Sequence, residues 1–293
     1  MTTTWTTTDL PAQRGRTYVI TGANSGIGLA AARALGVAGA HVVLAVRDLG
    51  RGRAAAATVP GSTEVRQLDL ADLSSVRRFA DRWSGDVDVL IDNAGIMAVP
   101  KGRTADGFER QLGTNHLGHF MLTNLLLPQV TDRVVVVASL SHRMGRIDRT
   151  DLSWERRRYA RWRAYGQSKL ANLLFVLELQ RRLDAAGSPI RAVAAHPGWA
   201  ATNLQTRGGN VLRDGLGRLG NRMLAQPDDM GALPTLYAAT QDLPGGSYVG
   251  PDGRFELRGH PTLVGRTDAA LDLDTAAWLW TESERLTGMP AAI

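Results

Sequence analysis

The chain has 293 residues, 44% of them hydrophobic and 21% charged, which suits one α/β domain spanning residues 1–293 with a large buried core. It contains no cysteine, which excludes disulfides, thiolate metal ligands and a cysteine nucleophile, and we expect no metal site. No stretch approaches the ~20 consecutive apolar residues of a membrane span, and residues 1–16 lack the apolar core of a secretory signal. We therefore expect a cytoplasmic protein with no membrane span.

Short apolar runs rich in β-branched residues alternate along the chain with helical patterns. The apolar runs cover residues 18–20, 41–46, 65–68, 87–91, 134–137 and 190–194. Apolar residues at spacings of three and four predict helices over residues 27–37, 73–83, 108–127 and 170–183. Strands that are apolar on both faces, with helices between them, predict a Rossmann-type doubly wound parallel sheet with helices on both faces.

The first strand runs directly into a glycine-rich loop at residues 21–28. Gly22 allows a tight turn, Gly26 lets backbone N–H groups approach a pyrophosphate, and Gly28 lets the next helix pack close to the strand. A glycine trio can also be no more than a turn, but its position after the first strand of an α/β chain predicts a dinucleotide site. The predicted cofactor contacts in this loop are Gly22, Asn24, Ser25, Gly26, Ile27 and Gly28.

The residues that follow the second and third strands predict which dinucleotide binds. Arg47 comes directly after the second strand, and a guanidinium suits a 2′-phosphate. We therefore predict NADP(H) rather than NAD(H); the alternative is that Arg47 is a surface residue, that Asp48 caps the next helix, and that NAD binds. Asp69 and Leu70 follow the third strand and are expected near the adenine, with a helix N-cap as the alternative for Asp69.

Two polar residues before the middle of the chain are candidates for catalysis. Asn115 lies within a helical pattern, where asparagine has a poor propensity, which suggests a specific role such as catalysis. The alternative is a packing or surface role. Ser139 follows the strand at 134–137, so its hydroxyl is expected at the carboxyl end of a parallel strand, where ligands bind. Ser141 is the rival candidate, and either serine can simply begin a turn.

Basic residues are concentrated in residues 156–163. The formal net charge of +6 identifies no partner by itself, because arginines alternate with acids along most of the chain. In this run arginines are interleaved with aromatic residues: Trp154, Arg156, Arg157, Arg158, Tyr159, Arg161, Trp162 and Arg163. Such a mixture can bind nucleic acid, but the run is short and isolated, so we predict no nucleic-acid partner. We interpret it as a solvated loop or as the rim of a site for an anionic cofactor.

Tyr165 and Lys169 lie four residues apart at the start of a helical pattern, so their side chains share one helix face. A free tyrosine has a pKa near 10, and a cation within roughly 4–6 Å lowers that pKa by favouring the phenolate. Lys169 is one of only two lysines among 34 basic residues. A pair at this spacing is common in helices and by itself more often has no catalytic role, but the scarcity of lysine elsewhere favours the hypothesis that it exchanges a proton with a substrate.

The pattern changes after residue 202. Residues 203–226 are rich in glycine and arginine, and we expect them to form a lid over the substrate site. Within them Leu212, Leu216, Leu219 and Met223 form an apolar helical stripe, which indicates core packing or, as the alternative, a wall for a lipophilic substrate. A helix over residues 227–239 and a short strand over 247–249 are expected next.

These residues together resemble the short-chain dehydrogenase/reductases, and within them the group of retinol dehydrogenases. The resemblance runs from about residue 17 to 286. Its motifs are Thr-Gly-x-x-x-Gly-x-Gly at 21–28, Asn93-Ala94-Gly95, Asn-His-Leu-Gly-His-Phe at 115–120, Tyr-Gly-Gln-Ser-Lys at 165–169, and His196-Pro197-Gly198. Where the family often has Asn-Asn-Ala-Gly, this chain has Asp92 as the first residue. Some vertebrate relatives have membrane anchors; we expect none here, which argues against a microsomal location.

The resemblance implies a catalytic tetrad of Asn115, Ser139, Tyr165 and Lys169. Tyr165 would be the general acid in reduction and the base in oxidation, Ser139 would orient the carbonyl, Lys169 would bind the ribose, and Asn115 would hold a water. Further cofactor contacts implied by the family are Asn93, Ala94, Gly95, Pro197, Gly198 and Thr202.

The implied function is NADP(H)-dependent interconversion of an alcohol and a carbonyl on a small-molecule, lipophilic substrate. Relatives often form homodimers or homotetramers, so the same is expected here. The alternative is an NADP(H)-sensing binding protein that uses this fold without turnover.

Overall fold

A computed structural model gives the structure of the chain and describes residues 4–199 and 227–289. Eight strands form one sheet in the order β3-β2-β1-β4-β5-β6-β7-β8. Neighbouring strands are parallel from β3 to β7, and β8 pairs antiparallel with β7. The strands are β1 (Thr17–Thr21), β2 (His41–Val46), β3 (Ser62–Gln67), β4 (Val87–Asp92), β5 (Val130–Val137), β6 (Arg191–Ala195), β7 (Tyr248–Pro251) and β8 (Pro261–Leu263). The predicted doubly wound parallel sheet is confirmed.

The central strands are buried on both faces because their apolar residues alternate between two cores. Val19 of β1 lies beside Val43 and Leu90, and all three belong to one core. The next residue along, Ile20, lies beside Leu44 and Ile91, in the core on the opposite face. Continuous apolar strands of this kind are expected only where helices cover both faces of a parallel sheet.

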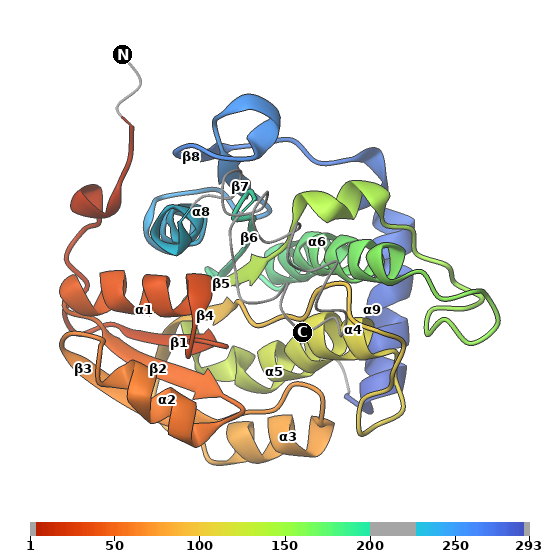
Figure 1. The fold of residues 1–293 in the computed structure, drawn as a ribbon, viewed down its shortest axis with the longest axis horizontal. Coiled ribbons are helices and arrows are strands. Elements are labelled where there is room, and N and C mark those ends of the chain that lie inside the picture. The colour runs from red at the N-terminus through yellow and green to blue at the C-terminus, as the bar shows by residue number, and fades with distance from the viewer. Residues whose placement is uncertain (1–3, 200–226, 290–293) are drawn as a thin grey trace, which may run out of the picture.

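Helices cover the two faces as the alternation predicts. One core includes residues of α1, α2 and α8; the other includes residues of α3, α5, α6 and α9. Figure 1 shows α1 and α8 on one side of the strands and α3 and α5 on the other. The longer helices are α1 (Gly26–Val37), α2 (Leu49–Ala56), α3 (Leu73–Asp81), α5 (Gly118–Leu126), α6 (Arg161–Ala185), α8 (Asp228–Thr240) and α9 (Leu273–Thr287). The helix α9 and the three-residue strand β8 were not predicted.

The helix predicted over residues 108–127 is not one regular helix. It consists of α4 (Arg110–Leu112), a π-helical segment η2 (Gly113–Leu117) and α5. Its glycines allow close packing: a β-carbon on Gly113 would lie 2.4 Å from Thr104, and one on Gly118 would lie 2.4 Å from the carbonyl oxygen of Leu70. Asn115 therefore occupies a π-helical turn, a feature often found at functional sites.

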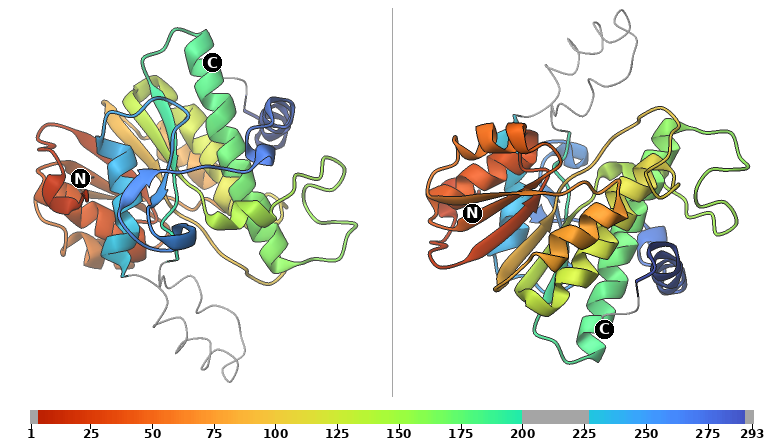
Figure 2. Two further views of the ribbon diagram at one scale, coloured as in Figure 1. Left: turned by 90° about the horizontal axis from the view of Figure 1, so that it is seen from above. Right: turned by 90° about the horizontal axis from the view of Figure 1, so that it is seen from below.

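The segment between η4 (Leu140–Met144) and α6 projects from the body of the molecule in both views of Figure 2; it contains the first part of the basic run, and Arg161 and Arg163 lie in the first turn of α6. Its base is ordered by Asp151, whose carboxylate accepts hydrogen bonds from the backbone N–H groups of Glu155, Arg156 and Arg157. The Arg157 guanidinium lies 3.7 Å from the ring centroid of Trp154. Arg157 is thus part of the fold, whereas the other four arginines of the run, at 156, 158, 161 and 163, are exposed.

Among the described residues, no helix combines the length and apolar character needed to cross a bilayer. The predicted lid at residues 203–226 and the predicted contact at Thr202 lie outside the described residues.

Candidate active site

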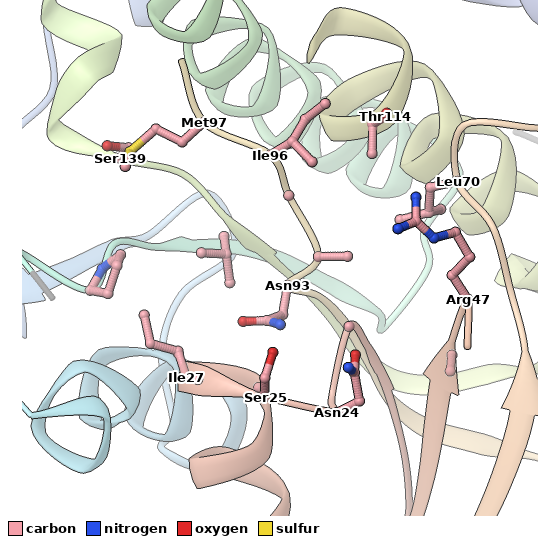
Figure 3. Close-up of a pocket in the computed structure, with 18 of the residues that line it drawn as sticks. Asn24, Ser25, Ile27, Arg47, Leu70, Asn93, Ile96, Met97, Thr114 and Ser139 are labelled. Carbon is pink, nitrogen blue, oxygen red and sulfur yellow. The ribbon is translucent and has the colours of Figure 1, made fainter. Parts of the chain in front are cut away.

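A cavity of about 280 Å³ lies at the carboxyl ends of the parallel strands. It is lined by Ser139, Tyr165 and Lys169, and by every predicted cofactor contact in the described part of the chain: Gly22, Asn24, Ser25, Gly26, Ile27, Gly28, Arg47, Asp69, Leu70, Asn93, Ala94, Gly95, Pro197 and Gly198. Figure 3 shows Arg47 toward one end and Ser139 and Met97 toward the other. The tertiary structure therefore brings residues from the ends of six strands, β1 to β6, to one site.

The glycine loop has the backbone that a phosphate site requires. Gly22 and Gly26 have φ values of +68° and +58°, a region that residues with a β-carbon rarely adopt. A β-carbon on Gly28 would lie 2.5 Å from Nδ2 of Asn93 and 3.0 Å from the carbonyl oxygen of Gly22. The helix α1 begins here, and its N-cap, Ser25, makes no side-chain capping bond. Its first N–H groups are thus available to an anion.

Two arginines line the cavity beyond the end of β2. Arg47 is exposed, and in the described part of the chain no carboxylate pairs with it. Asp48 caps α2 by accepting a 3.1 Å bond from the N–H of Arg51, so that part of the alternative interpretation is confirmed, yet Arg47 still faces the cavity. Arg51 also lines it and was missed; its spacing of four from Arg47 was the available signal.

The loops after β3 and β4 form the next wall. The carboxylate of Asp69 accepts a 3.0 Å bond from the N–H of Ala71. The helix α3 is instead capped by Asp72, so the alternative that Asp69 is its N-cap is wrong. Asn93 and Ala94 are held by Thr21, whose hydroxyl accepts a 2.9 Å bond from each of their N–H groups.

Asn115 lies behind this wall and does not line the cavity. Its side chain is fully buried; Oδ1 accepts a 2.8 Å bond from the N–H of Ile96, and Nδ2 donates to the Ile96 carbonyl and to Oγ of Ser168, each at 2.9 Å. A surface role for Asn115 is therefore wrong. The arrangement shows the amide holding the chain at Ile96, next to Gly95.

A buried histidine completes this support and was not singled out from the sequence. Burial lowers the pKa of His119 to about 3, so the ring is neutral. Its Nδ1 lies 3.0 Å from the carbonyl oxygen of Asn115, which requires Nδ1 to donate. Its Nε2 then accepts from the Thr21 hydroxyl at 2.9 Å. One side chain thus connects the backbone of Asn115 to the strand that begins the glycine loop.

Ser139, Tyr165 and Lys169 meet at the end of the cavity opposite Arg47. Of the two candidate serines, Ser139 lines the cavity and Ser141 does not. The Ser139 hydroxyl forms a hydrogen bond with the Tyr165 side chain. Nζ of Lys169 lies 5.9 Å from the centre of the Tyr165 ring and donates a 2.8 Å bond to the carbonyl of Val137.

The pKa of Tyr165 is shifted in the direction opposite to that expected. Burial raises it to about 12, against the smaller lowering effect of the hydrogen bond from Ser139. Burial also lowers the pKa of Lys169 to about 8. Desolvation therefore outweighs the neighbouring cation, because the ammonium group is bonded to a backbone carbonyl rather than to the phenol. At neutral pH Tyr165 is protonated and Lys169 is mostly charged.

Part of the cavity wall is apolar and was not predicted; Figure 3 shows its Met97 beside Ser139. This apolar part is formed by Ile96, Met97 and Val99, which follow Asn93-Ala94-Gly95. Ala98 between them has a φ of +50°, and its N–H donates a 2.7 Å bond to the side chain of Gln111. The apolar composition of residues 96–99 was the available signal.

Replacing Asp92 by asparagine is expected to stabilise the protein at neutral and alkaline pH. Asp92 is fully buried at the end of β4, and burial raises its pKa to about 8, whereas an unfolded aspartate titrates near 4. Between these values the native state binds the extra proton, so wild-type stability falls as the pH rises from about 4 to about 8. At pH 7 we expect Asp92→Asn to add on the order of 3 kcal/mol.

Thermal denaturation at pH 5, 7 and 9 tests this expectation, because the advantage of Asp92→Asn should grow with pH up to about 8. Thr123 already donates a 2.7 Å bond to one oxygen of Asp92, which asparagine can still accept. Asp242→Asn is the control, since the Asp242 side chain is 98% exposed. A variant less stable than wild type at pH 9 would contradict the burial of an ionisable carboxyl as the dominant effect.

Comparisons with known proteins agree with the geometry of the site. The family model of the short chain dehydrogenases matches residues 16–210. Retinol dehydrogenase 13 of Homo sapiens is 40% identical over 294 residues, covering 94% of this chain and 86% of that protein. Polyprenol dehydrogenase of Mus musculus is 40% identical over 298 residues, covering 95% and 86%. A crystal structure of a protein from Mycobacterium paratuberculosis is 59% identical, with a TM-score of 0.86 and 98% of both chains covered. The chain therefore belongs to the short-chain dehydrogenase/reductase family, in its retinol dehydrogenase-like group, and is an NAD(P)-dependent oxidoreductase.

Proposed function

We propose that this protein interconverts a lipophilic alcohol and its carbonyl compound with NADP(H) as cofactor and Tyr165 as the acid/base. The observation that carries the proposal is the layout of the cavity. A phosphate-type glycine loop and Arg47 lie toward one end, and Ser139, Tyr165 and Lys169 meet at the other. A dinucleotide needs such separated sites for its phosphates and for its reactive ring.

The residues present fit NADP(H). The glycine loop and the free first turn of α1 would hold the pyrophosphate, and Arg47 with Arg51 would bind the 2′-phosphate. Asp69 and Leu70 would border the adenine, while Asn93, Ala94, Gly95, Pro197 and Gly198 would line the path toward the nicotinamide. We include Thr202 among the proposed contacts. When bound, the cofactor supplies or accepts the hydride.

Tyr165 supplies the proton in reduction. Its raised pKa keeps the phenol protonated at neutral pH, so the proton is available when a substrate carbonyl becomes an alkoxide. Ser139, already bonded to Tyr165, would donate a hydrogen bond to the same carbonyl and orient it. The charged Lys169, 5.9 Å from the ring centre, would stabilise the phenolate that remains. In oxidation the same phenolate takes a proton from the alcohol.

Asn115 contributes to the proposed tetrad through the wall of the cavity. Its amide holds the backbone at Ile96, and its own carbonyl is bonded by His119. A carbonyl oxygen has two lone pairs, so that of Asn115 can accept a second hydrogen bond besides the one from His119. We therefore keep in the proposal that Asn115 holds a water for proton relay.

A lipophilic substrate is supported by two observations. The wall formed by Ile96, Met97 and Val99 is apolar, and its Met97 lies beside Ser139 (Figure 3). Two relatives that match almost the whole chain are named as dehydrogenases of retinol and of polyprenol, both of which are apolar alcohols. We further propose a cytoplasmic location, which suits a chain without cysteine, and a homodimeric or homotetrameric assembly.

The test is a turnover screen of the purified protein with NADP⁺ and NADPH across lipophilic alcohols, aldehydes and steroids. We expect a change in NADPH absorbance with at least one apolar pair, and weak activity with short, polar alcohols. Tight NADPH binding with no turnover of any alcohol or carbonyl would contradict the proposed function.

A further inference from the structure

A turn between the last two strands of the sheet has an unfavourable backbone conformation. It lies between β7 and β8, in η6 (Arg254–Glu256), where Phe255 and Glu256 have φ values of +58° and +57°. Consecutive residues with β-carbons rarely adopt this left-handed region. Burial does not compensate, because Phe255 is 66% exposed. Interactions elsewhere in the turn must therefore hold this conformation.

The side chain of Glu256 provides those interactions. One carboxylate oxygen, Oε1, accepts a 2.8 Å bond from the guanidinium of Arg143. The other, Oε2, lies 3.1 Å from Nε2 of His196. A carboxylate that accepts from a guanidinium makes a charge-assisted hydrogen bond, which is stronger than a neutral one. The left-handed turn thus places one carboxylate between two donors that are 53 positions apart in the sequence, Arg143 and His196.

The bond to His196 connects Glu256 to the cofactor side of the cavity. His196 follows β6, is fully buried, and has its pKa lowered by burial, so the ring is neutral at pH 7. Its Nδ1 accepts a 3.2 Å bond from the N–H of Gly198, which leaves the proton on Nε2, facing Glu256. A β-carbon on Gly250 would lie 2.0 Å from this Nε2. The ring is therefore confined by Glu256, by the backbone of β7 at Gly250, and by the N–H of Gly198, which lines the cavity.

The turn also contacts that wall through its backbone. The N–H of Trp199 donates a 2.7 Å bond to the carbonyl of Leu257. Gly198 has a φ of +66°, and a β-carbon there would lie 2.5 Å from the same carbonyl oxygen. Gly198, which lines the cavity next to Pro197, is thus packed directly against the turn that contains Glu256.

The bond to Arg143 connects Glu256 to the segment that contains Ser139. Arg143 lies in η4, which follows Ser139 directly. Within this segment the hydroxyl of Ser139 accepts a 3.1 Å bond from the N–H of Ser141, and Nδ1 of His142 lies 2.8 Å from the carbonyl of Ser139. A shift of η4 would therefore move the hydroxyl that is bonded to Tyr165.

We propose that Glu256 is a positioning residue: its carboxylate holds the Ser139 segment and the Pro197–Gly198 wall in one fixed arrangement, and so aligns the nicotinamide end of the cofactor with Ser139 and Tyr165. The inference rests on the proposed function, which places the nicotinamide end of the cofactor beside Ser139 and Tyr165. Glu256 does not line the cavity; it acts through its bonds to Arg143 and His196.

The test compares the binding of the whole cofactor with the binding of a fragment that lacks the nicotinamide. Glutamine at position 256 can accept a bond from only one of the two donors through its single carbonyl oxygen. In Glu256→Gln we expect the Kd of NADPH, measured by nicotinamide fluorescence, to rise about tenfold. The Kd of 2′-phospho-ADP-ribose, which lacks the nicotinamide, should stay within about twofold of wild type. A merely structural role would change both constants together.

Matched variants sharpen the interpretation. Glu282→Gln is the control, since the Glu282 side chain is 22% exposed, against 21% for Glu256, and pairs with Arg285 at 2.6 Å. It should change neither Kd. Arg143→Gln should also raise the Kd of NADPH, but by less than Glu256→Gln does. The loss of binding free energy in the Arg143→Gln/Glu256→Gln double variant should be smaller than the sum of the losses in the two single variants, because both remove the same bond. Unchanged NADPH binding in Glu256→Gln, or equal losses for NADPH and the fragment, would overturn the proposal.

Failure of this inference and failure of the proposed function give different results. A wild-type protein that binds NADPH without turnover would contradict the proposed function, yet the ratio of the two dissociation constants would still test Glu256. If NADH binds more tightly than NADPH, the same experiment applies with NADH and ADP-ribose. Where turnover is measurable, Glu256→Gln should also lower kcat by about tenfold, since misalignment affects the hydride step and not only binding.

Discussion

Tyr165→Phe is expected to lower kcat by roughly 10³-fold while leaving the Kd of NADPH within about twofold of wild type. The substitution removes only the phenolic O–H, which lies in the cavity beside Ser139. Without it no proton reaches the alkoxide, and no base accepts one from the alcohol. The ring itself remains to fill its buried position, so the cavity that binds the cofactor should be preserved.

Steady-state kinetics with the best substrate, together with NADPH fluorescence titration, measure this split. Tyr237→Phe is the matched control, because Tyr237 lies on α8 and packs against Trp5, outside the cavity. It should retain full activity. Wild-type turnover in Tyr165→Phe would refute the role of Tyr165 as acid/base, and a large loss of NADPH binding would indicate a structural role instead.

Arg47→Asp is expected to weaken NADPH binding about 100-fold and NADH binding about threefold or less. The guanidinium of Arg47 follows β2 at the cavity end away from Tyr165, and within the described residues it has no carboxylate partner. A 2′-phosphate would therefore lose a charge-assisted bond and meet a like charge. NADH lacks that phosphate, and a carboxylate at this position can accept hydrogen bonds from its ribose hydroxyls.

Dissociation constants for both cofactors, measured at one salt concentration, give the ratio that decides this point, because salt screens exposed charges. Arg53→Asp is the control: Arg53 is exposed on the same helix, α2, but does not line the cavity. Its change of charge should affect the two cofactors equally and weakly. Equal losses for NADPH and NADH in Arg47→Asp would identify NAD(H) as the cofactor.

The parts of the fold that sequence reasoning predicted are those with a strong local pattern. Continuous apolar runs predicted β1, β2, β4, β5 and β6, because a strand buried on both faces has no polar alternation to obscure it. The helix α8 was predicted over residues 227–239, within one residue of its bounds, Asp228–Thr240. The strand β8 was missed because it has three residues, too few for any periodicity. The π-helical turn at Asn115 was missed because it covers only five residues, too few for its wider spacing to stand out from the helical pattern on either side.

The sequence by itself determined most of the residues that meet at the cavity. Parallel strands end at one edge of a sheet, so residues placed just after them, such as Arg47, Asn93 and Ser139, must converge there. Tyr165 and Lys169 share a helix face by spacing alone. Only the tertiary structure decided how these groups behave. Burial raises the pKa of Tyr165 to about 12, although its neighbouring lysine led us to expect the opposite. The contacts of Glu256 with residues 60 and 113 positions away depend on a left-handed turn. Desolvation and long-range contacts arise only when distant segments pack together, and no local spacing encodes them.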